Sequence, residues 1–253
     1  MSIQYLGSLG STARQYSSFN VNAADPTDIY RFSIGSNRNI NLSLNNITYG
    51  GDADLRLYRD ANNNGVLDSY DRTYGYVASS TKSSNADDAI NVKANAGTYF
   101  AEVYRYAGGL GGNGYVFYDL DLSATTRAST ADYSNLLPKE FVVGNLTSDT
   151  TRYGYISDSN TADVYNFSLG LYKGVSISLT GLSSDADIRL IRDYNNNRVV
   201  DAGEEVARST RGGSTSELIA NIDQSGDYFL QVNQYLGNTS YAVTFDQYNT
   251  PYA

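Results

Sequence analysis

An internal repeat constrains this chain more than any other feature of its sequence, because two copies of one unit must share one fold. Residues 28–34 read DIYRFSI and residues 163–169 read DVYNFSL, while residues 52–60 read DADLRLYRD and residues 185–193 read DADIRLIRD. Two shorter pairs complete the repeat: LGSL at 6–9 with VGNL at 143–146, and GTYF at 97–100 with GDYF at 226–229. The pairs keep one order and nearly one separation, so the sequence predicts two homologous domains of roughly 115–125 residues each.

The stretch between the two copies is small and polar. Residues 123–135 read SATTRASTADYSN and show no apolar periodicity, which is typical of a linker. We therefore expect a first domain over residues 1–124, a linker over residues 125–137 and a second domain over residues 138–253.

Within each copy the apolar residues alternate with polar ones. Residues 39–47 place Ile40, Leu42 and Leu44 on one face, and residues 174–182 do the same with Val175, Ile177 and Leu179. This is the period of a strand with one buried face, and no segment shows a long helical period. The 24 Tyr and 23 Gly residues suit strands joined by tight turns. The sequence predicts an all-β protein of two tandem antiparallel β-sandwich domains, jelly-roll-like in form.

Each copy carries an acidic loop directly after its Asp-x-Asp strand. Residues 60–71 (the first loop) read DANNNGVLDSYD, and residues 193–204 (the second loop) read DYNNNRVVDAGE. Side-chain oxygens fall at loop positions 1, 3, 5, 9 and 12, with a backbone carbonyl at position 7, which is the calcium-ligand spacing of an EF-hand. The predicted ligands are Asp60, Asn62, Asn64, Val66, Asp68 and Asp71 in the first loop, and Asp193, Asn195, Asn197, Val199, Asp201 and Glu204 in the second.

The two loops differ at position 6, where the first has Gly65 and the second has Arg198. A positive φ at this position would cost a residue with a Cβ roughly 1 kcal/mol. The flanking segments read as strands, so we expect the loops on β-hairpins without the helices of an EF-hand. The alternative is a metal-free turn, because Asn, Asp and Gly favour turns in any case. Asp54 and Asp187 are further candidates that either face the ion or cap a strand end.

The composition excludes several classes of site. With no His and no Cys, the chain has neither Ser–His nor Cys–His catalysis and no thiolate metal site. A metal here is a hard, oxygen-preferring ion, so the expected cofactor is Ca²⁺. The formal net charge of -9 argues against nucleic acid. No constellation of catalytic residues is recognisable, so we expect no enzyme activity.

The order of these motifs resembles that of the bacterial pre-peptidase C-terminal domain. In the first copy the resemblance rests on Gly7, Leu9, Asp28, Tyr30, Phe32, Asp52, Asp54, Leu55, Leu57, Gly97, Tyr99 and Phe100. In the second copy it rests on Gly144, Leu146, Asp163, Tyr165, Phe167, Asp185, Asp187, Ile188, Leu190, Gly226, Tyr228 and Phe229. The resemblance implies a jelly-roll-like β-sandwich that serves secreted bacterial proteases as a calcium-stabilised accessory module. The internal Asp/Asn loop is similar to a calcium-loop variant of this family, and this chain contains no peptidase domain.

The sequence therefore predicts a non-catalytic, calcium-binding structural or adhesion module, secreted or at the cell surface. Neither a signal peptide nor a transmembrane stretch is visible, so signal-less export or a cytoplasmic location stays open. One alternative function is a module that binds an extracellular protein or polysaccharide while its calcium is purely structural, and another is a cytosolic calcium buffer or sensor. The tyrosines considered for ligand binding, which otherwise pack the sandwich, are Tyr104, Tyr106, Tyr115, Tyr235 and Tyr241.

Overall fold

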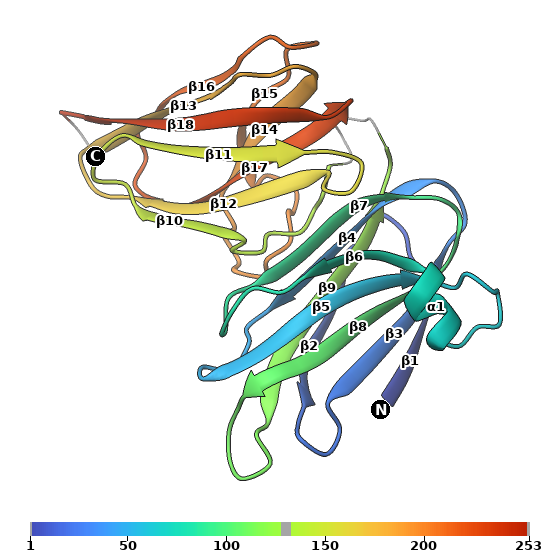
Figure 1. The fold of residues 1–253 in the computed structure, drawn as a ribbon. Helices are drawn as coiled ribbons and strands as arrows, with labels where there is room; N and C mark the ends of the chain where they lie inside the picture. Colours follow the sequence, from blue (N-terminus) through green and yellow to red (C-terminus); the bar gives the residue numbers. More distant parts are fainter. Residues whose placement is uncertain (1, 128–132, 252–253) are drawn as a thin grey trace. The chain divides into compact units, whose positions relative to one another are not determined.

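The computed structural model describes residues 2–127 and 133–251, which fall into two compact units (Figure 1). The units are Met1–Arg127 and Ala128–Ala253. Each unit consists of two β-sheets, which confirms the predicted all-β class and the two tandem sandwiches. Residues 128–132 of the predicted linker lie outside the described residues.

The first unit pairs a five-stranded sheet with a four-stranded one. The larger sheet has the order β1 (Ser2–Ser8), β3 (Thr27–Ile34), β8 (Gly97–Gly108), β5 (Gly51–Arg59) and β6 (Tyr76–Ser80). The smaller sheet has the order β2 (Arg14–Val21), β9 (Val116–Thr125), β4 (Arg38–Asn45) and β7 (Asp88–Ala94). One short helix, α1 (Ser69–Tyr74), begins near the end of the first loop.

The second unit repeats this arrangement strand for strand. Its five-stranded sheet has the order β10 (Phe141–Asn145), β12 (Ala162–Leu169), β17 (Gly226–Leu236), β14 (Asp185–Ile191) and β15 (Glu205–Ser209). Its four-stranded sheet has the order β11 (Thr150–Ile156), β18 (Thr239–Asn249), β13 (Lys173–Thr180) and β16 (Glu217–Ile222).

One strand pair in each unit departs from the predicted antiparallel arrangement. β1 pairs with β3 in parallel, and β10 pairs with β12 in parallel. Parallel neighbours need a long crossover connection. Here the chain crosses to the four-stranded sheet between the two partners and returns, since β2 and β11 belong to that sheet. The alternation of side chains predicts a strand but not the direction of its neighbour.

The core of each sandwich follows the alternation read from the sequence. In β5, Leu55 and Leu57 point between the sheets and are fully buried, as is Leu42 of β4 from the opposite sheet. Burial of one such leucine stabilises the fold by about 1.5–3 kcal/mol. The other side of the five-stranded sheet, which we call the outer face, carries Asp54 and Arg56 at the alternate positions of β5.

The outer face of each unit holds a second, small apolar cluster. Leu67, at position 8 of the first loop, packs there with Tyr58 and Phe100. In the second unit Val200, at the same loop position, packs against Phe229 and Ile191. Each acidic loop therefore packs against its sheet through the apolar side chain at loop position 8.

The segment 133–137 differs from the predicted linker. Leu136 and Leu137 are buried, and Leu137 belongs to the small cluster of the second unit. The backbone N–H of Leu137 donates to the carbonyl of Arg198 at 2.9 Å, and that of Val200 donates to the carbonyl of Asn135 at 2.9 Å. These residues are part of the second unit because they bind its loop. Within the described ranges, no helix has the length and hydrophobicity of a membrane span.

Candidate metal centre

Position 1 of each loop is a carboxylate that shapes the turn, buried in the first loop and half-buried in the second. Asp60 is 4% exposed. Its Oδ1 accepts the backbone N–H of Asn64 at 3.1 Å, and its Oδ2 accepts that of Gly65 at 2.9 Å. Asp193 accepts the N–H groups of Asn197 and Arg198 at the same two distances. The loop chain is therefore wrapped around the first carboxylate in both units.

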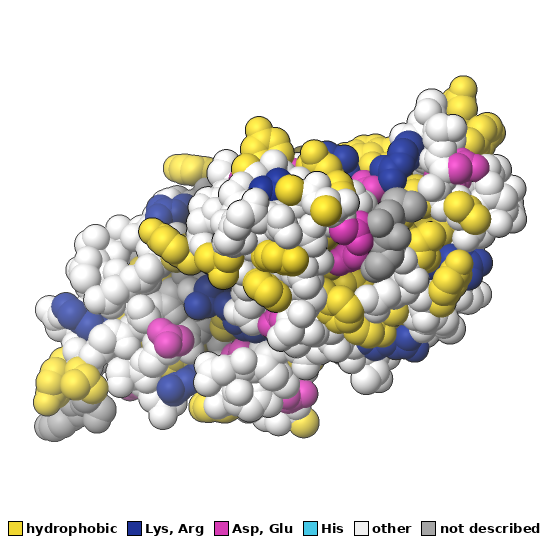
Figure 2. All heavy atoms as spheres, turned by 90° about the horizontal axis from the view of Figure 1, so that it is seen from below, with side chains coloured by type: hydrophobic (Ala, Val, Ile, Leu, Met, Phe, Trp, Pro, Cys, Tyr) yellow, Lys and Arg dark blue, Asp and Glu magenta, His cyan; other side chains and the backbone are white. Residues whose placement is uncertain are grey.

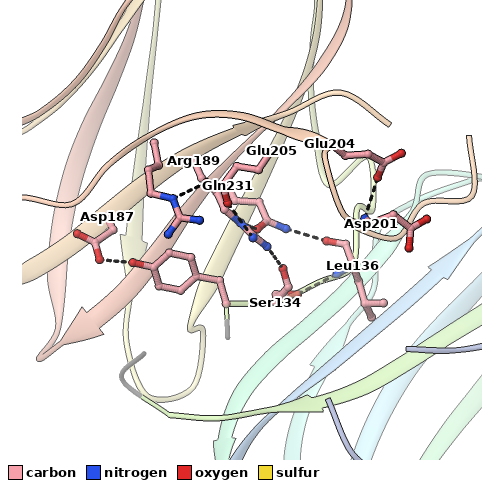
Figure 3. A network of polar contacts seen from close by, with 10 residues as sticks. Ser134, Leu136, Asp187, Arg189, Asp201, Glu204, Glu205 and Gln231 are labelled. Atoms are coloured by element: carbon pink, nitrogen blue, oxygen red, sulfur yellow. Dashed lines mark hydrogen bonds and ion pairs between the residues drawn. The ribbon is translucent and has the colours of Figure 1, made fainter. Parts of the chain in front are cut away.

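Position 12 closes each loop with a second buried carboxylate. Asp71 accepts the backbone N–H groups of Ala61 at 2.7 Å and of Asp68 at 3.3 Å. Glu204 accepts those of Tyr194 and Asp201, both at 2.9 Å. Figure 3 shows Glu204 next to Asp201 in the second loop. The longer side chain of Glu204 reaches the same two loop positions as Asp71, so the replacement preserves the closure.

The carboxylate at position 9 accepts hydrogen bonds from both asparagine side chains at positions 3 and 5 of its loop. Oδ2 of Asp68 accepts the amide groups of Asn62 at 3.0 Å and Asn64 at 2.7 Å. In the second loop Asp201 accepts those of Asn195 and Asn197, both at 2.8 Å. The hydrogen bonds from the Asn62 amide and from the backbone of Asp71 hold the pKa of Asp68 below its usual value.

Position 6 requires a left-handed backbone in both loops. Gly65 has φ of 77° and Arg198 has φ of 63°. The second loop therefore adopts the same turn although Arg198 carries a Cβ. The arginine side chain has compensating contacts, since its Nη1 donates to the carbonyl of Leu137 at 3.0 Å and its guanidinium lies 5.6 Å from the ring centre of Phe229.

The first loop runs into a helix that the sequence analysis did not predict. Asp68 is the N-cap of α1, and Asp68 and Asp71 form a capping box. The spacing of these two acids is the signal that reveals the helix in the sequence, but six residues are too short to show a helical period. Strand β6 consequently begins only at Tyr76. The second loop leads through a turn into β15 with no helix, so the two loops are connected to their next strands in different ways.

The chemical types of the oxygen ligands in each loop suit calcium. Carboxylate and amide side chains at positions 1, 3, 5, 9 and 12 are brought together, and Val66 and Val199 lie at position 7 of their loops. Among the described residues, no three Asp or Glu side chains form a metal site by themselves. The ligands would therefore be a mixture of carboxylate, amide and carbonyl oxygens, as calcium accepts. The Asn amide groups that now direct N–H to Asp68 and Asp201 would have to turn and present oxygen.

Asp54 and Asp187 are not brought to the loops. Asp54 precedes Asp60 by six residues along β5, and at about 3.3 Å per residue these two positions are roughly 20 Å apart. Asp54 lines a pocket of about 200 Å³ with Asp52, Thr81, Ser83 and Tyr106, which we call the first pocket. The repeat has a second pocket of about 190 Å³, lined by Asp185, Asp187, Thr210, Gly212 and Tyr235.

The tyrosines considered for ligand binding divide into three groups. Tyr106 and Tyr235 line the two pockets, while Tyr104 and Tyr115 are partly exposed. Tyr241 does not belong to a binding surface, because it is 3% exposed and its hydroxyl lies 2.8 Å from that of Tyr165 and donates to Asp163. Its surroundings repeat those of the buried Tyr118 in the first unit.

The outer face of each unit also carries a network of side-chain hydrogen bonds that the sequence does not predict. In the first unit Arg72 of α1 binds the buried Glu102 of β8 with two hydrogen bonds, at 2.6 and 3.0 Å. In the second unit Gln231 stands at the equivalent position and accepts from Arg189 at 2.7 Å, while its amide donates to the carbonyl of Leu136 at 2.8 Å (Figure 3). The residues involved are distant in sequence, so only the folded sheet brings them together.

Solved structures similar to this chain come from several kinds of protein. The pre-peptidase C-terminal domain of collagenase from Bacillus anthracis shares 25% identity over 48% of this chain and 93% of its own, with a TM-score of 0.32. PliG of Aeromonas hydrophila, a periplasmic inhibitor of g-type lysozyme, shares 14% identity over 42% of this chain and 97% of its own, with a TM-score of 0.28. The CUB1-EGF-CUB2 domains of rat MASP-1 share 7% identity over 96% of this chain and 99% of theirs, with a TM-score of 0.28.

No curated protein matches this chain. The family described as the bacterial pre-peptidase C-terminal domain matches residues 26–105 and again residues 161–234. The two matched segments lie one in each unit and include both Asp-x-Asp strands and both acidic loops. Domains of this family are typically non-catalytic accessory modules of secreted bacterial peptidases, and no catalytic domain is detected in this chain. The chain belongs to the bacterial pre-peptidase C-terminal domain family and carries two copies of its domain in tandem.

Proposed function

We propose that this protein is a calcium-dependent, non-catalytic module in which each acidic loop binds one Ca²⁺ and thereby stabilises its own β-sandwich. The observation that carries the proposal is the agreement between the two loops. Positions 1, 3, 5, 7 and 9 have the same residue in both loops and position 12 stays acidic, whereas positions 2, 6, 8, 10 and 11 all differ. Apart from the asparagine at position 4, which has a positive φ in both loops, the shared residues are those that calcium would need.

The hydrogen bonds within the loops support a site whose carboxylates are fixed in position before an ion binds. Both position-1 carboxylates accept two backbone N–H groups, and both position-12 carboxylates do the same. An ionised carboxyl group has about four acceptor positions, so these bonds leave lone pairs for an ion. A divalent cation would also offset the repulsion between the three carboxylates of each loop.

Calcium binding would act on the fold through the small apolar cluster. The loop side chains Leu67 and Val200 pack onto the outer face of their sheets, and an ordered loop keeps them there. A ligand that binds only the folded state at a hundredfold excess over its dissociation constant stabilises that state by about 2.7 kcal/mol. For domains of this size the midpoint of thermal unfolding would rise by roughly 10 °C.

The biological setting that we propose is outside the cell, as a structural or adhesion module. Membership of a family that occurs in secreted bacterial peptidases supports this setting. The face of the molecule in Figure 2 carries its Lys and Arg side chains in small groups among acidic and uncharged ones. Such a surface favours proteins or polysaccharides over nucleic acid as partners.

Calorimetric titration of the apo protein with calcium tests the proposal. The wild-type chain should bind one ion per loop, and Asp60→Asn and Asp193→Asn should each remove one of the two binding events. The variant with both substitutions should bind none and should melt at one temperature in calcium and in chelator. Magnesium serves as the control ion, because its octahedral preference suits these loops poorly. A wild-type chain that binds no calcium and shows no calcium-dependent shift of its melting midpoint would refute the proposal.

A further inference from the structure

The first pocket, formed by Asp52, Asp54, Thr81, Ser83 and Tyr106, is separate from the acidic loops. It lies on the outer face of the first unit, where β5 begins and β8 ends, and the hydroxyl residues come from the connection between β6 and β7. Its volume of about 200 Å³ is enough for the end of one side chain. The second unit repeats the pocket with the equivalent residues, which shows that it is a regular feature of this fold and not an accident of one loop.

The carboxylates of the first pocket lack hydrogen-bond donors. Asp54 is only 5% exposed, yet no donor within residues 2–127 contacts its carboxyl group. Oδ1 of Asp52 is buried and also has no partner among the described residues. Burial and the neighbouring charge of Asp52 raise the pKa of Asp54. Asp52 as a whole is half-buried, so the pocket holds one buried and one half-buried carboxylate without donors. This arrangement is costly unless a cation or donor group from another molecule meets it.

The cation nearest in sequence, Arg56, donates no hydrogen bond to Asp54, although its charge lowers the pKa of Asp54 by less than burial and Asp52 raise it. Arg56 is the next residue of β5 on the outer face, but its guanidinium lies 5.0 Å from the ring centre of Tyr104 and 3.8 Å from the carboxylate of Glu102. The rim of the pocket presents the ring of Tyr106, which is 66% exposed. An exposed tyrosine ring beside a carboxylate pair is a favourable environment for an organic cation.

The second unit shows the same carboxylate with its donor in place. There Asp187 accepts a hydrogen bond from the hydroxyl of Tyr133, a residue of the segment that precedes β10. The guanidinium of Arg189, the counterpart of Arg56, lies 5.5 Å from the ring centre of Tyr133. The second unit thus supplies from its own chain the donor that Asp54 lacks.

We propose that the first pocket binds the positively charged end of a lysine or arginine side chain of a protein partner. An ammonium group offers three N–H donors, which the carboxylates of Asp52 and Asp54 and the hydroxyls of Thr81 and Ser83 accept, while the ring of Tyr106 covers its alkyl stem and charge. Calcium fits the pocket less well, because it needs six to eight oxygen ligands and no third carboxylate joins the pair among the described residues. The proposal is independent of calcium binding at the acidic loops.

Titration of the ¹⁵N-labelled full chain with N-acetyl-lysine amide, in the presence of calcium, tests the proposal by NMR. The amide signals of Thr81, Ser83 and Tyr106 should shift with a millimolar dissociation constant, and N-acetyl-norleucine amide, which has an aliphatic side chain without charge, should leave them in place. Asp54→Asn should weaken binding by at least about tenfold, equivalent to about 1.4 kcal/mol. Asp187→Asn, the matched change in the second unit, should leave the affinity unchanged.

Several results would overturn the assignment: equal shifts with the norleucine compound, unchanged affinity in Asp54→Asn, or an equal loss in Asp187→Asn. Displacement of the lysine compound when the calcium concentration is raised further would identify a metal site and would also overturn the assignment. If Asp54→Asn does not fold, Tyr106→Leu at the exposed rim takes its place, and unchanged affinity in that variant has the same consequence. Since the acidic loops are tested by calorimetry on their own variants, failure at one site is distinguishable from failure at the other.

Discussion

Replacement of Tyr133 by phenylalanine removes a single hydroxyl from a buried carboxylate. Asp187 is 2% exposed, and Tyr133 donates a hydrogen bond to it. A hydrogen bond to a charged group contributes about 1.5–3 kcal/mol, and a buried carboxylate left without its donor loses that contribution in full. We therefore expect Tyr133→Phe to lower the free energy of unfolding of the second unit by about 2 kcal/mol at neutral pH.

The free energy of unfolding that Tyr133→Phe removes should be larger at high pH than at low pH. Burial raises the pKa of Asp187 to about 6, while the hydroxyl of Tyr133 lowers it. An unfolded Asp titrates near 3.9, so between the two values the folded state binds more protons and stability falls as the pH rises. In Tyr133→Phe the folded pKa rises further. The difference between wild type and variant is therefore largest above the folded pKa and shrinks as Asp187 becomes protonated.

Urea unfolding followed by NMR measures this effect, because the signals report on each unit separately. At about pH 7.5 the variant should lose about 2 kcal/mol, and at about pH 5 less than about 1 kcal/mol. Tyr153→Phe is the matched control, since that tyrosine is 82% exposed and should change nothing measurable. An equal loss at both pH values, or a loss below about 0.5 kcal/mol at the higher one, would refute the reasoning.

Two further predictions concern the loops and the outer face, and both are measured by urea unfolding. Gly65→Ala should lower the free energy of unfolding of the first unit by about 1 kcal/mol, because the φ of Gly65 is 77°. Arg198→Gly should leave the free energy of unfolding of the second unit nearly unchanged, since glycine removes the strain at φ 63° but loses the hydrogen bond to Leu137. Equal changes in the two variants would contradict this reasoning. Arg72→Met should lower the free energy of unfolding of the first unit by about 1–3 kcal/mol, because it leaves Glu102, which is 2% exposed, without its bidentate partner. Adding Glu102→Gln to this variant should restore most of the lost stability. If it restores none, Arg72 acts mainly through packing.

The acidic loops were accessible to sequence analysis because their contacts are local. Every hydrogen bond that joins Asp60, Asp68 and Asp71 to the loop spans at most ten residues. The spacing of oxygen-bearing residues therefore identifies the side chains that each loop brings together, whereas the positive φ at position 6 was only a condition in the sequence and is observed in the structure. Helix α1 was missed because six residues give no period, although the capping pair Asp68 and Asp71 marks its start.

The pockets and the outer-face network were not accessible in this way. Asp54 and Tyr106 come from different strands that are distant in the chain, and their proximity depends on the register of β5 against β8. The burial of Tyr241 likewise depends on the opposite sheet, where Tyr165 receives it. An alternating strand reveals which residues share a face, but not which face is covered or by what.

The sequence by itself determined the duplicated all-β architecture and the composition of two loops suited to calcium, because alternation, repeat order and ligand spacing are properties of neighbouring residues. The tertiary structure decided how the two copies differ. It joins residues 133–137 to the second unit, where Tyr133 meets Asp187, and it leaves Asp54 of the first unit buried without a donor among residues 2–127. The donors and acceptors concerned are tens of residues apart in the chain, so their pairing is fixed only when the two sheets and their connections have packed.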